Sequence, residues 1–454
     1  TIINSAIDGN NSTITNSSNT KSNTLTFEFS GNDTGVGISN FECSIDNSNF
    51  SACSSPVQSI NLTEGDHTVK IRAQDSVGNI GVSPASFSWS VDTEAPLTSI
   101  NSVTDGNNTA ISTGGNTSSN TVMFEFAGTD SGVGLSHFEC SLDESEFITC
   151  SSPLQINSLT DGIHTLETRA HDNVGNKDLS LASFNWKVDT IAPTTIINSA
   201  IDGNNSTITN SSSTKSNAVM LEFSGNDTGG VGIDHLECSL DGTSFSVCTS
   251  PVQFTSANLL DGTHSFMVIA QDKVGNMMTT PLLFNWTVDT LPPTTAINTA
   301  IDGNNGTLVS GNSTMSTSMS FTFSGNDRGL NENNGVGIKQ IECSIDNSNF
   351  TACVSPIEYS NLTEGVHRLE VVSEDKVGNK GSIPSSFNWT IDTKAPSTSI
   401  FSATDGNNNL MAPGSNTSSN SMTFEFSAND TGGSEDKGVG IKQIECSIDN
   451  SNFT

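Results

Sequence analysis

Eight cysteines of this 454-residue chain are spaced for covalent cross-links. They form four couples, each ten residues apart: Cys43 and Cys53, Cys140 and Cys150, Cys238 and Cys248, and Cys343 and Cys353. A strand, a turn and a returning strand bring residues at this spacing within the roughly 4–7 Å between Cα atoms that a disulfide needs. We therefore predict four disulfides. Zinc is disfavoured, because neither a second Cys-x-x-Cys nor a suitably spaced His accompanies a couple.

Three aspartates recur together and could form a site for a hard cation. One opens an Asp-Thr-x-x-Pro marker, one ends a Gly-Asn-Asp-like segment, and one opens an Asp-x-x-Gly-Asn turn. The three sets are Asp92, Asp130 and Asp172; Asp189, Asp227 and Asp272; and Asp289, Asp327 and Asp375. Carboxylate oxygens are ligands that calcium takes. The alternative is that the third aspartate closes its own turn through side-chain-to-backbone hydrogen bonds while the first caps the linker turn.

Asn-x-Ser/Thr sequons are a third chemical feature, and they predict N-glycosylation on turns and strand edges. The candidate acceptors are Asn11, Asn16, Asn32, Asn61, Asn107, Asn116, Asn205, Asn210, Asn226, Asn285, Asn312, Asn361, Asn388, Asn416 and Asn429. A chain rich in Asn, Ser and Thr also produces sequons by chance. Together with disulfides, which persist in oxidising compartments, the sequons favour an extracellular location.

These residues belong to an internal repeat of about 100 residues. The Asp-Thr-x-x-Pro marker begins at Asp92, Asp189, Asp289 and Asp392, and five copies of the unit start on the chain. We place the domains at 1–94, 95–191, 192–291, 292–394 and 395–454, the last one truncated. The ninth cysteine, Cys446, lacks a partner in this sequence, because the position ten residues after it would be 456 and the sequence ends at Thr454. We therefore expect the sequence to be an excerpt of a longer chain.

Each copy shows apolar residues at every second position, the pattern of half-buried strands. Leu25, Phe27 and Phe29 alternate with polar residues, and so do the apolar residues of 41–45, 67–73 and 87–91. Clusters rich in Asp, Asn and Gly separate these segments, and no long stretch has helical spacing. About seven short strands in 100 residues predict an all-β sandwich.

Composition excludes several classes of partner. The net charge of −33 would repel phosphate backbones and anionic lipid, so we expect neither nucleic acid nor membrane-surface binding. No apolar run is long enough to insert in a membrane. Only 33% of the residues are hydrophobic, which suits several thin cores better than one thick core. No serine nucleophile elbow, phosphate loop or paired metal motif is present, so we do not expect an enzyme.

The motifs resemble the tandem immunoglobulin-like (fibronectin-type-III-like) repeats of large bacterial and archaeal cell-surface proteins. In the second copy the matching residues are Glu139-Cys140, Phe147, Cys150, Ser152-Pro153, Leu159, Gly162, His164, Ala170, Asp172, Gly175-Asn176, Phe184, Trp186 and Asp189. The resemblance covers nearly the whole chain. It implies an extracellular, non-enzymatic array of β-sandwich domains arranged as beads on a string.

The same resemblance gives roles to several recurring residues. In such sandwiches the loops after the second and sixth strands lie where the preceding domain enters, which would bring each aspartate set to one junction. His67, His164, His264 and His367 stand where related sandwiches use a Tyr to bond back to the backbone. Trp89, Trp186, Trp286 and Trp389 are expected in the core rather than as sugar-stacking platforms.

The leading functional hypothesis is a stalk, a surface fibre or an adhesin shaft. Its partners would be neighbouring repeats of the same chain, other copies in a fibre or surface layer, and covalently attached glycans. No cofactor is required, with calcium as the candidate ion. Two alternatives stay open: carbohydrate or host-ligand binding through the variable loops after Asp33, Asp130, Asp227, Asp327 and Asp430, and an accessory segment of a large secreted enzyme.

Overall fold

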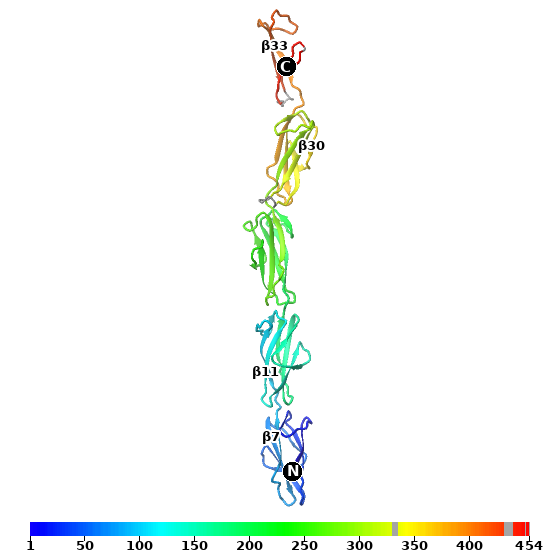
Figure 1. Cartoon of the computed structure of the whole chain (residues 1–454), viewed down its shortest axis with the longest axis vertical. Coiled ribbons are helices and arrows are strands. Elements are labelled where there is room, and N and C mark those ends of the chain that lie inside the picture. The colour runs from blue at the N-terminus through cyan, green and yellow to red at the C-terminus, as the bar shows by residue number, and fades with distance from the viewer. Residues whose placement is uncertain (329–334, 431–438, 450, 454) are drawn as a thin grey trace. The chain divides into compact units, whose positions relative to one another are not determined.

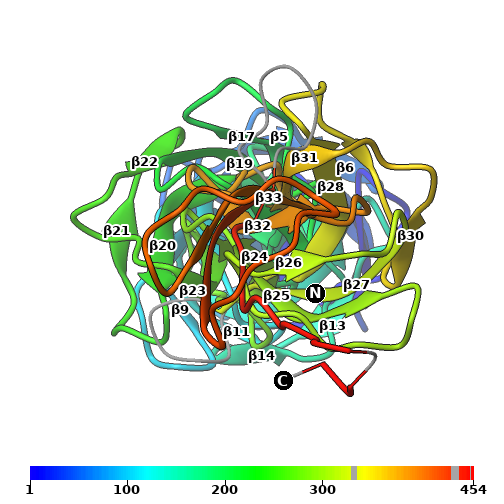
Figure 2. The ribbon, with the colours of Figure 1, turned by 90° about the horizontal axis from the view of Figure 1, so that it is seen from above.

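Strands and turns make up the whole described part of the protein. The computed structural model describes residues 1–328, 335–430, 439–449 and 451–453. Within these ranges there is no helix, and Figures 1 and 2 show arrows joined by loops only. It follows that no helix of the described chain is long and apolar enough to cross a membrane. The all-β prediction is confirmed.

The first repeat is a two-layer sandwich of eight strands. Its strands are β1 (Ile2–Asp8), β2 (Ser18–Thr20), β3 (Leu25–Ser30), β4 (Ile38–Ile45), β5 (Ser51–Cys53), β6 (Val57–Ser59), β7 (Gly65–Asp75) and β8 (Ala85–Val91). One sheet has the order β1-β3-β6 and the other β2-β8-β7-β4-β5. The pairs are antiparallel except for β2, which runs parallel to β8. The three-residue polar strand β2 is too short to show an alternation, which is why about seven strands were expected rather than eight.

The following repeats reproduce this element order. The second contains β9 (Leu97–Asp105), β10 (Gly115–Thr117), β11 (Val122–Thr129), β12 (Leu135–Leu142), β13 (Ile148–Cys150), β14 (Leu154–Ile156), β15 (Gly162–Asp172) and β16 (Ala182–Val188). The third contains β17 (Thr194–Asp202), β18 (Ser212–Thr214), β19 (Val219–Asn226), β20 (Ile233–Leu240), β21 (Ser246–Cys248), β22 (Val252–Phe254), β23 (Gly262–Asp272) and β24 (Leu282–Val288).

The fourth repeat is again complete, and a fifth segment follows it. The fourth contains β25 (Thr294–Asp302), β26 (Ser313–Thr314), β27 (Met319–Asn326), β28 (Ile338–Ile345), β29 (Thr351–Ala352), β30 (Ile357–Tyr359), β31 (Gly365–Asp375) and β32 (Ser385–Ile391). The fifth segment pairs β33 (Ser397–Asp405) with β34 (Met422–Asn429). Two compact units account for the chain: Thr1–Thr194 with Gly225–Leu236 and Ile269–Thr280, and Thr195–Ser224 with Glu237–Val268 and Pro281–Thr454.

Each core lies between the two sheets and is built from the alternating residues. In the first repeat Leu25, Phe27 and Phe29 of β3 pack with residues of β7 and β8, Trp89 among them. The four tryptophans Trp89, Trp186, Trp286 and Trp389 are at most 2% exposed. They are therefore core residues, as expected, and none offers a surface for stacking a sugar.

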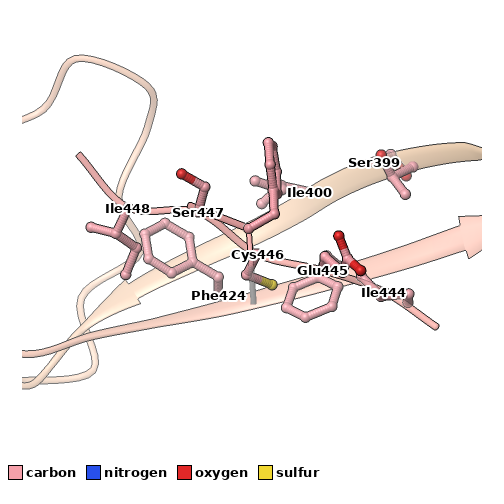
Figure 3. Close-up of a pocket in the computed structure, with 11 residues that line it drawn as sticks. Ser399, Ile400, Phe424, Ile444, Glu445, Cys446, Ser447 and Ile448 are labelled. Carbon is pink, nitrogen blue, oxygen red and sulfur yellow. The ribbon is translucent and has the colours of Figure 1, made fainter. Parts of the chain in front are cut away.

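Disulfides join the cysteine couples across an edge of the larger sheet. Cys43 of β4 is bonded to Cys53 of β5 with 5.9 Å between the Cα atoms, and the other couples have the same separation to within 0.1 Å. Cys446 is an exposed free thiol. In the fifth segment it lies in a recess beside Ile400 and Phe424 (Figure 3).

Candidate metal centre

Three strand ends bring the predicted aspartates together. Asp92 follows β8 directly, Asp130 follows β11, and Asp172 is the last residue of β15. One carboxylate oxygen from each lies within 4.8 Å of the other two. The same holds for Asp189, Asp227 and Asp272 and for Asp289, Asp327 and Asp375. The structure thus assembles all three sets that the repeat spacing picked out.

The third aspartate of each set also closes its own turn. Asp172 Oδ1 accepts hydrogen bonds from the backbone N–H of Val174 (2.9 Å) and Asn176 (2.8 Å), and Oδ2 accepts one from Asn176 Nδ2 (2.7 Å). Turn closure and cluster formation were posed as alternatives. The structure shows both at the same residue, because the turn bonds fix the carboxylate at the place where the other two arrive.

The other two carboxylates of the first set each keep an unpaired oxygen. Asp92 is only 1% exposed, and its Oδ2 accepts the N–H of Val133 at 2.9 Å. Its Oδ1 is buried without a hydrogen-bond donor, and so is Oδ1 of Asp130. A buried carboxylate oxygen without a partner costs free energy that a bound cation would offset. The donor set of three carboxylates fits calcium.

Electrostatic repulsion within two of the sets also favours binding of a cation, and it is visible in raised aspartate pKa values. Burial raises the pKa of Asp92, and the negative charges of Asp130 and Asp172 raise it further. Burial likewise raises the pKa of Asp289, with the charges of Asp327 and Asp375 adding to the effect. These two sets therefore hold their negative charge at a cost, and a divalent cation would remove that cost.

The variable loop holds the linker in a way that sequence reasoning missed. Its closing Val donates its backbone N–H to Oδ2 of the preceding linker aspartate, as Val133 does to Asp92 and Val231 does to Asp189 at 2.8 Å. Asn176 Nδ2, in addition, donates to the backbone carbonyl of Asp92 at 2.8 Å. The recurring Gly-Val-Gly and Gly-Asn pairs were the available signals. Residues 329–334 and 431–438, where this loop is longest, lie outside the described residues.

A glycine in this loop permits the close approach. A Cβ atom on Gly132 would lie 2.2 Å from Asp92 Oδ2, and one on Gly230 would lie 2.2 Å from Asp227 Oδ1. Real Cβ atoms do not come so close to an oxygen. Only glycine therefore lets the loop backbone pass over the clustered carboxylates.

The recurring histidines are structural. His67 Nδ1 lies 2.7 Å from Asp46 Oδ2, and its Nε2 lies 2.7 Å from the carbonyl of Thr63. Burial opposes the charged ring, but the bonds to Thr63 and Asp46 outweigh it and raise the pKa of His67. His164, His264 and His367 make the equivalent contacts. The expected bond back to the backbone is present, with an Asp as a second partner that the sequence did not reveal.

The sequon asparagines are almost all at the surface. Every one of the fifteen candidates is exposed except Asn285, which is half-buried. Asn16 and Asn210 use their side-chain oxygens to accept backbone N–H groups, from Ser88 and Asn285 respectively, at 2.7 Å. The side chains are therefore placed where a glycan would be solvated, and glycosylation itself stays a prediction.

One family model matches part of the chain. The family model for the bacterial Ig-like domain (group 3) matches residues 249–322, which begin in the third repeat and end in the fourth. Among curated proteins, none matches the sequence.

Solved structures of tandem extracellular repeats match the chain at low identity. A tetra-tandem repeat from the extending region of a large adhesion protein is 16% identical, covering 82% of this chain and 95% of its own, with a TM-score of 0.28. A 1.5-MDa bacterial ice-binding adhesin is 15% identical over 66% of this chain and 99% of its own, with a TM-score of 0.29. Cadherin domains 1–4 of protocadherin gamma B7 are 12% identical over 77% and 92%, with a TM-score of 0.32.

Proposed function

Because the chain is built of tandem immunoglobulin-like repeats, we propose that it is an extracellular structural segment, a stalk or adhesin shaft, whose linkers are stiffened by calcium. Its role is mechanical rather than enzymatic. The proposal rests chiefly on one observation. The linker residue Asp92 is only 1% exposed, and one of its carboxylate oxygens has no hydrogen-bond donor. Two further carboxylates lie close to it.

The geometry gives calcium a defined task at each linker. The linker aspartate directly follows the last strand of one repeat, whereas the other two acids lie at the ends of two strands of the next repeat. An ion that binds all three couples the linker to that next repeat, in addition to the hydrogen bonds from Val133 and Asn176. Without the ion, repulsion among the acids opposes that coupling.

Other features support an extracellular setting. Four disulfides close hairpins of the type that persists in oxidising compartments. The exposed sequons and the net charge of −33 would keep a long repeat surface solvated. Glycosylation and attachment to a cell surface belong to the proposal.

Calorimetric unfolding of the whole chain with calcium and with chelator tests the idea. Calcium should raise the unfolding temperature, and free ion at 100 times its Kd would add about 2.7 kcal/mol per site. Titration should count three equivalents, one for each described acid set. Small-angle scattering of the same samples should show a narrower spread of dimensions with calcium than with chelator.

Two charge-matched variants make the test specific. Asp92→Asn should remove one of the three equivalents, because it takes away the carboxylate with the unpaired oxygen. Asp105→Asn removes the same charge from a turn of the second repeat that belongs to no acid set, and it should leave all three equivalents in place. An unfolding temperature that does not respond to calcium would rule out the ion. Unchanged scattering despite bound calcium would rule out the stiffening.

A further inference from the structure

We propose that the second repeat carries a separate site for one divalent transition-metal ion, such as Zn²⁺ or Cu²⁺, formed by His137, Glu139 and His171. One ligand atom from each of these side chains lies within 4.8 Å of the other two. The site is distinct from the aspartate sets in its elements and in its chemistry. It adds a binding activity to the structural role proposed above and does not depend on that role.

Strand register creates the site. His137 of β12 and His171 of β15 are directly paired across two antiparallel strands, and Glu139 lies two residues along β12 on the same face. Their neighbours Phe138 and Cys140 pack in the core, so the three side chains occupy the opposite face of the sheet. The two imidazole rings are stacked, with centroids 4.6 Å apart and planes inclined by 17°. Directly opposed residues are the closest side-chain pair that a sheet offers.

The carboxylate is held in place before any ion arrives. Glu139 Oε2 receives hydrogen bonds from Arg169 Nε (2.9 Å) and Nη2 (2.8 Å), and His171 Nε2 lies 3.0 Å from the same oxygen. Arg169 is itself fixed over the ring of Phe147, 4.0 Å from its centroid. These contacts all use Oε2 and leave Oε1 to act as a ligand. Partners of this kind orient a metal-binding side chain and tune its affinity.

The fourth repeat shows that these three positions converge on one point. There Gln340 stands for His137, Glu342 for Glu139 and Glu374 for His171. The Gln340 side-chain nitrogen lies 2.8 Å from Glu342 Oε1 and 2.9 Å from Glu374 Oε2. A donor group thus bridges the two carboxylates in the fourth repeat, and the second repeat has two imidazoles and a carboxylate around the equivalent point.

The ligand types select the class of ion. Two imidazole nitrogens and one carboxylate oxygen suit Zn²⁺, Cu²⁺ or Ni²⁺, whereas calcium prefers oxygen ligands only. The side chains of His171 and Glu139 are 16% and 22% exposed, so an ion bound there keeps access to water or to a further ligand. The second repeat is the one that combines two histidines at these positions, since the first repeat has Asn40 and Gln74 there.

Isothermal titration of the whole chain with Zn²⁺ tests the proposal. All samples carry Cys446→Ser, because the free thiol would otherwise bind zinc, and excess calcium is present to saturate the aspartate sets. We expect one equivalent of Zn²⁺ to bind. His171→Gln, which places the residue found at the equivalent positions Gln74 and Gln271, should weaken that binding by at least about tenfold, the lower end of the cost of losing even an outer-sphere partner.

A matched histidine provides the control. His235 occupies in the third repeat the position of His137, with Gln271 in place of His171. His235→Gln should leave the affinity for Zn²⁺ unchanged. If His171→Gln and His235→Gln have equal effects, or if no equivalent binds with calcium present, the proposal is wrong. With Cu²⁺ as probe, electron paramagnetic resonance should show coupling to two imidazole nitrogens, and coupling to one or none would overturn the site.

Discussion

Buried aspartates recur along this chain both in turns and in linkers, and Asp105 and Asp92 show how differently their oxygens are satisfied. Asp105 is the last residue of the first strand of its repeat and closes a turn: Oδ1 accepts two backbone N–H groups and Oδ2 accepts the hydroxyl of Thr117 at 2.8 Å. Asp92 is more deeply buried, yet it has one donor and an unpaired oxygen. Burial alone therefore does not separate these two aspartates, whereas the unsatisfied acceptor does.

Where a pKa shift is present, it has opposite directions at turn and linker aspartates. Despite its burial, hydrogen bonds from Thr214 and Ser206 lower the pKa of the turn residue Asp202. Asn409 and Thr417 lower the pKa of the equivalent Asp405 to about 2. The pKa of Asp92 is raised. Asp202 and Asp405 thus stabilise the folded state as anions, whereas Asp92 does so only when its charge is neutralised.

The largest change in the free energy of unfolding should come from removing the negative charge at each kind of aspartate while calcium is chelated. Asp105→Asn should lower the free energy of unfolding by about 2 kcal/mol, because it weakens charge-assisted hydrogen bonds. Asp92→Asn should raise it by about 1 kcal/mol, because it removes an unpaired buried charge. Hydrogen exchange of β11 and β15 reports both changes. Two changes of the same sign would erase the distinction.

A smaller change in the free energy of unfolding should follow from filling the space between the loop backbone and the clustered carboxylates. Gly132→Ala places a methyl group against Asp92 Oδ2, so the loop must move away at a cost of about 1 kcal/mol, the lower end for overpacking, and calcium binding should weaken with it. Gly35 is the matched control in the first repeat, because a Cβ atom there would lie at an ordinary 3.4 Å from Asp33 Oδ2. If Gly35→Ala is as costly as Gly132→Ala, the linker aspartate is not the cause.

The smallest effect should be a difference in how local stability depends on pH around Asp92 and around Asp202, measured with chelator present. As pH falls from 7 towards 3.8, Asp92 takes up its proton earlier than an unfolded aspartate does, so the stability of its surroundings should rise. The turn at Asp202 should keep its stability above pH 3.8 and lose it as pH falls further through the lowered pKa. Hydrogen exchange, corrected for intrinsic rates, would show a common fall at both places if the distinction were wrong.

The fold and the aspartate sets could be predicted because both depend on recurrence. Alternation of Leu25, Phe27 and Phe29 indicated a half-buried strand, and the fixed spacing of the cysteine couples indicated hairpins. The aspartates of a set meet because the last strand of one repeat ends beside the ends of two strands of the next, as at Asp92, Asp130 and Asp172. The structure adds what spacing does not encode, namely that Asp172 closes its turn and also joins the cluster.

Other features could not be read from the sequence because they depend on single contacts. The unpaired oxygen of Asp92 depends on which N–H group of the next loop arrives, and Val133 satisfies only one of the two oxygens. His137 and His171 are 34 positions apart in sequence, and histidines occur at both of these positions in one repeat only, so recurrence did not reveal the pair. Their pairing follows from the strand register, which includes an irregularity between Leu135 and His137.

The short disulfide loop at the sheet edge has a consequence under tension. Cys43 and Cys53 are ten residues apart in sequence and 5.9 Å apart in space, and the bond survives when the strands separate. An unfolded repeat pulled from both ends therefore lengthens by about 30 Å less than its residue count allows, since ten extended residues span roughly 33–36 Å. The disulfide therefore limits how far each cross-linked repeat can extend, so a chain of such repeats lengthens less each time one repeat unfolds.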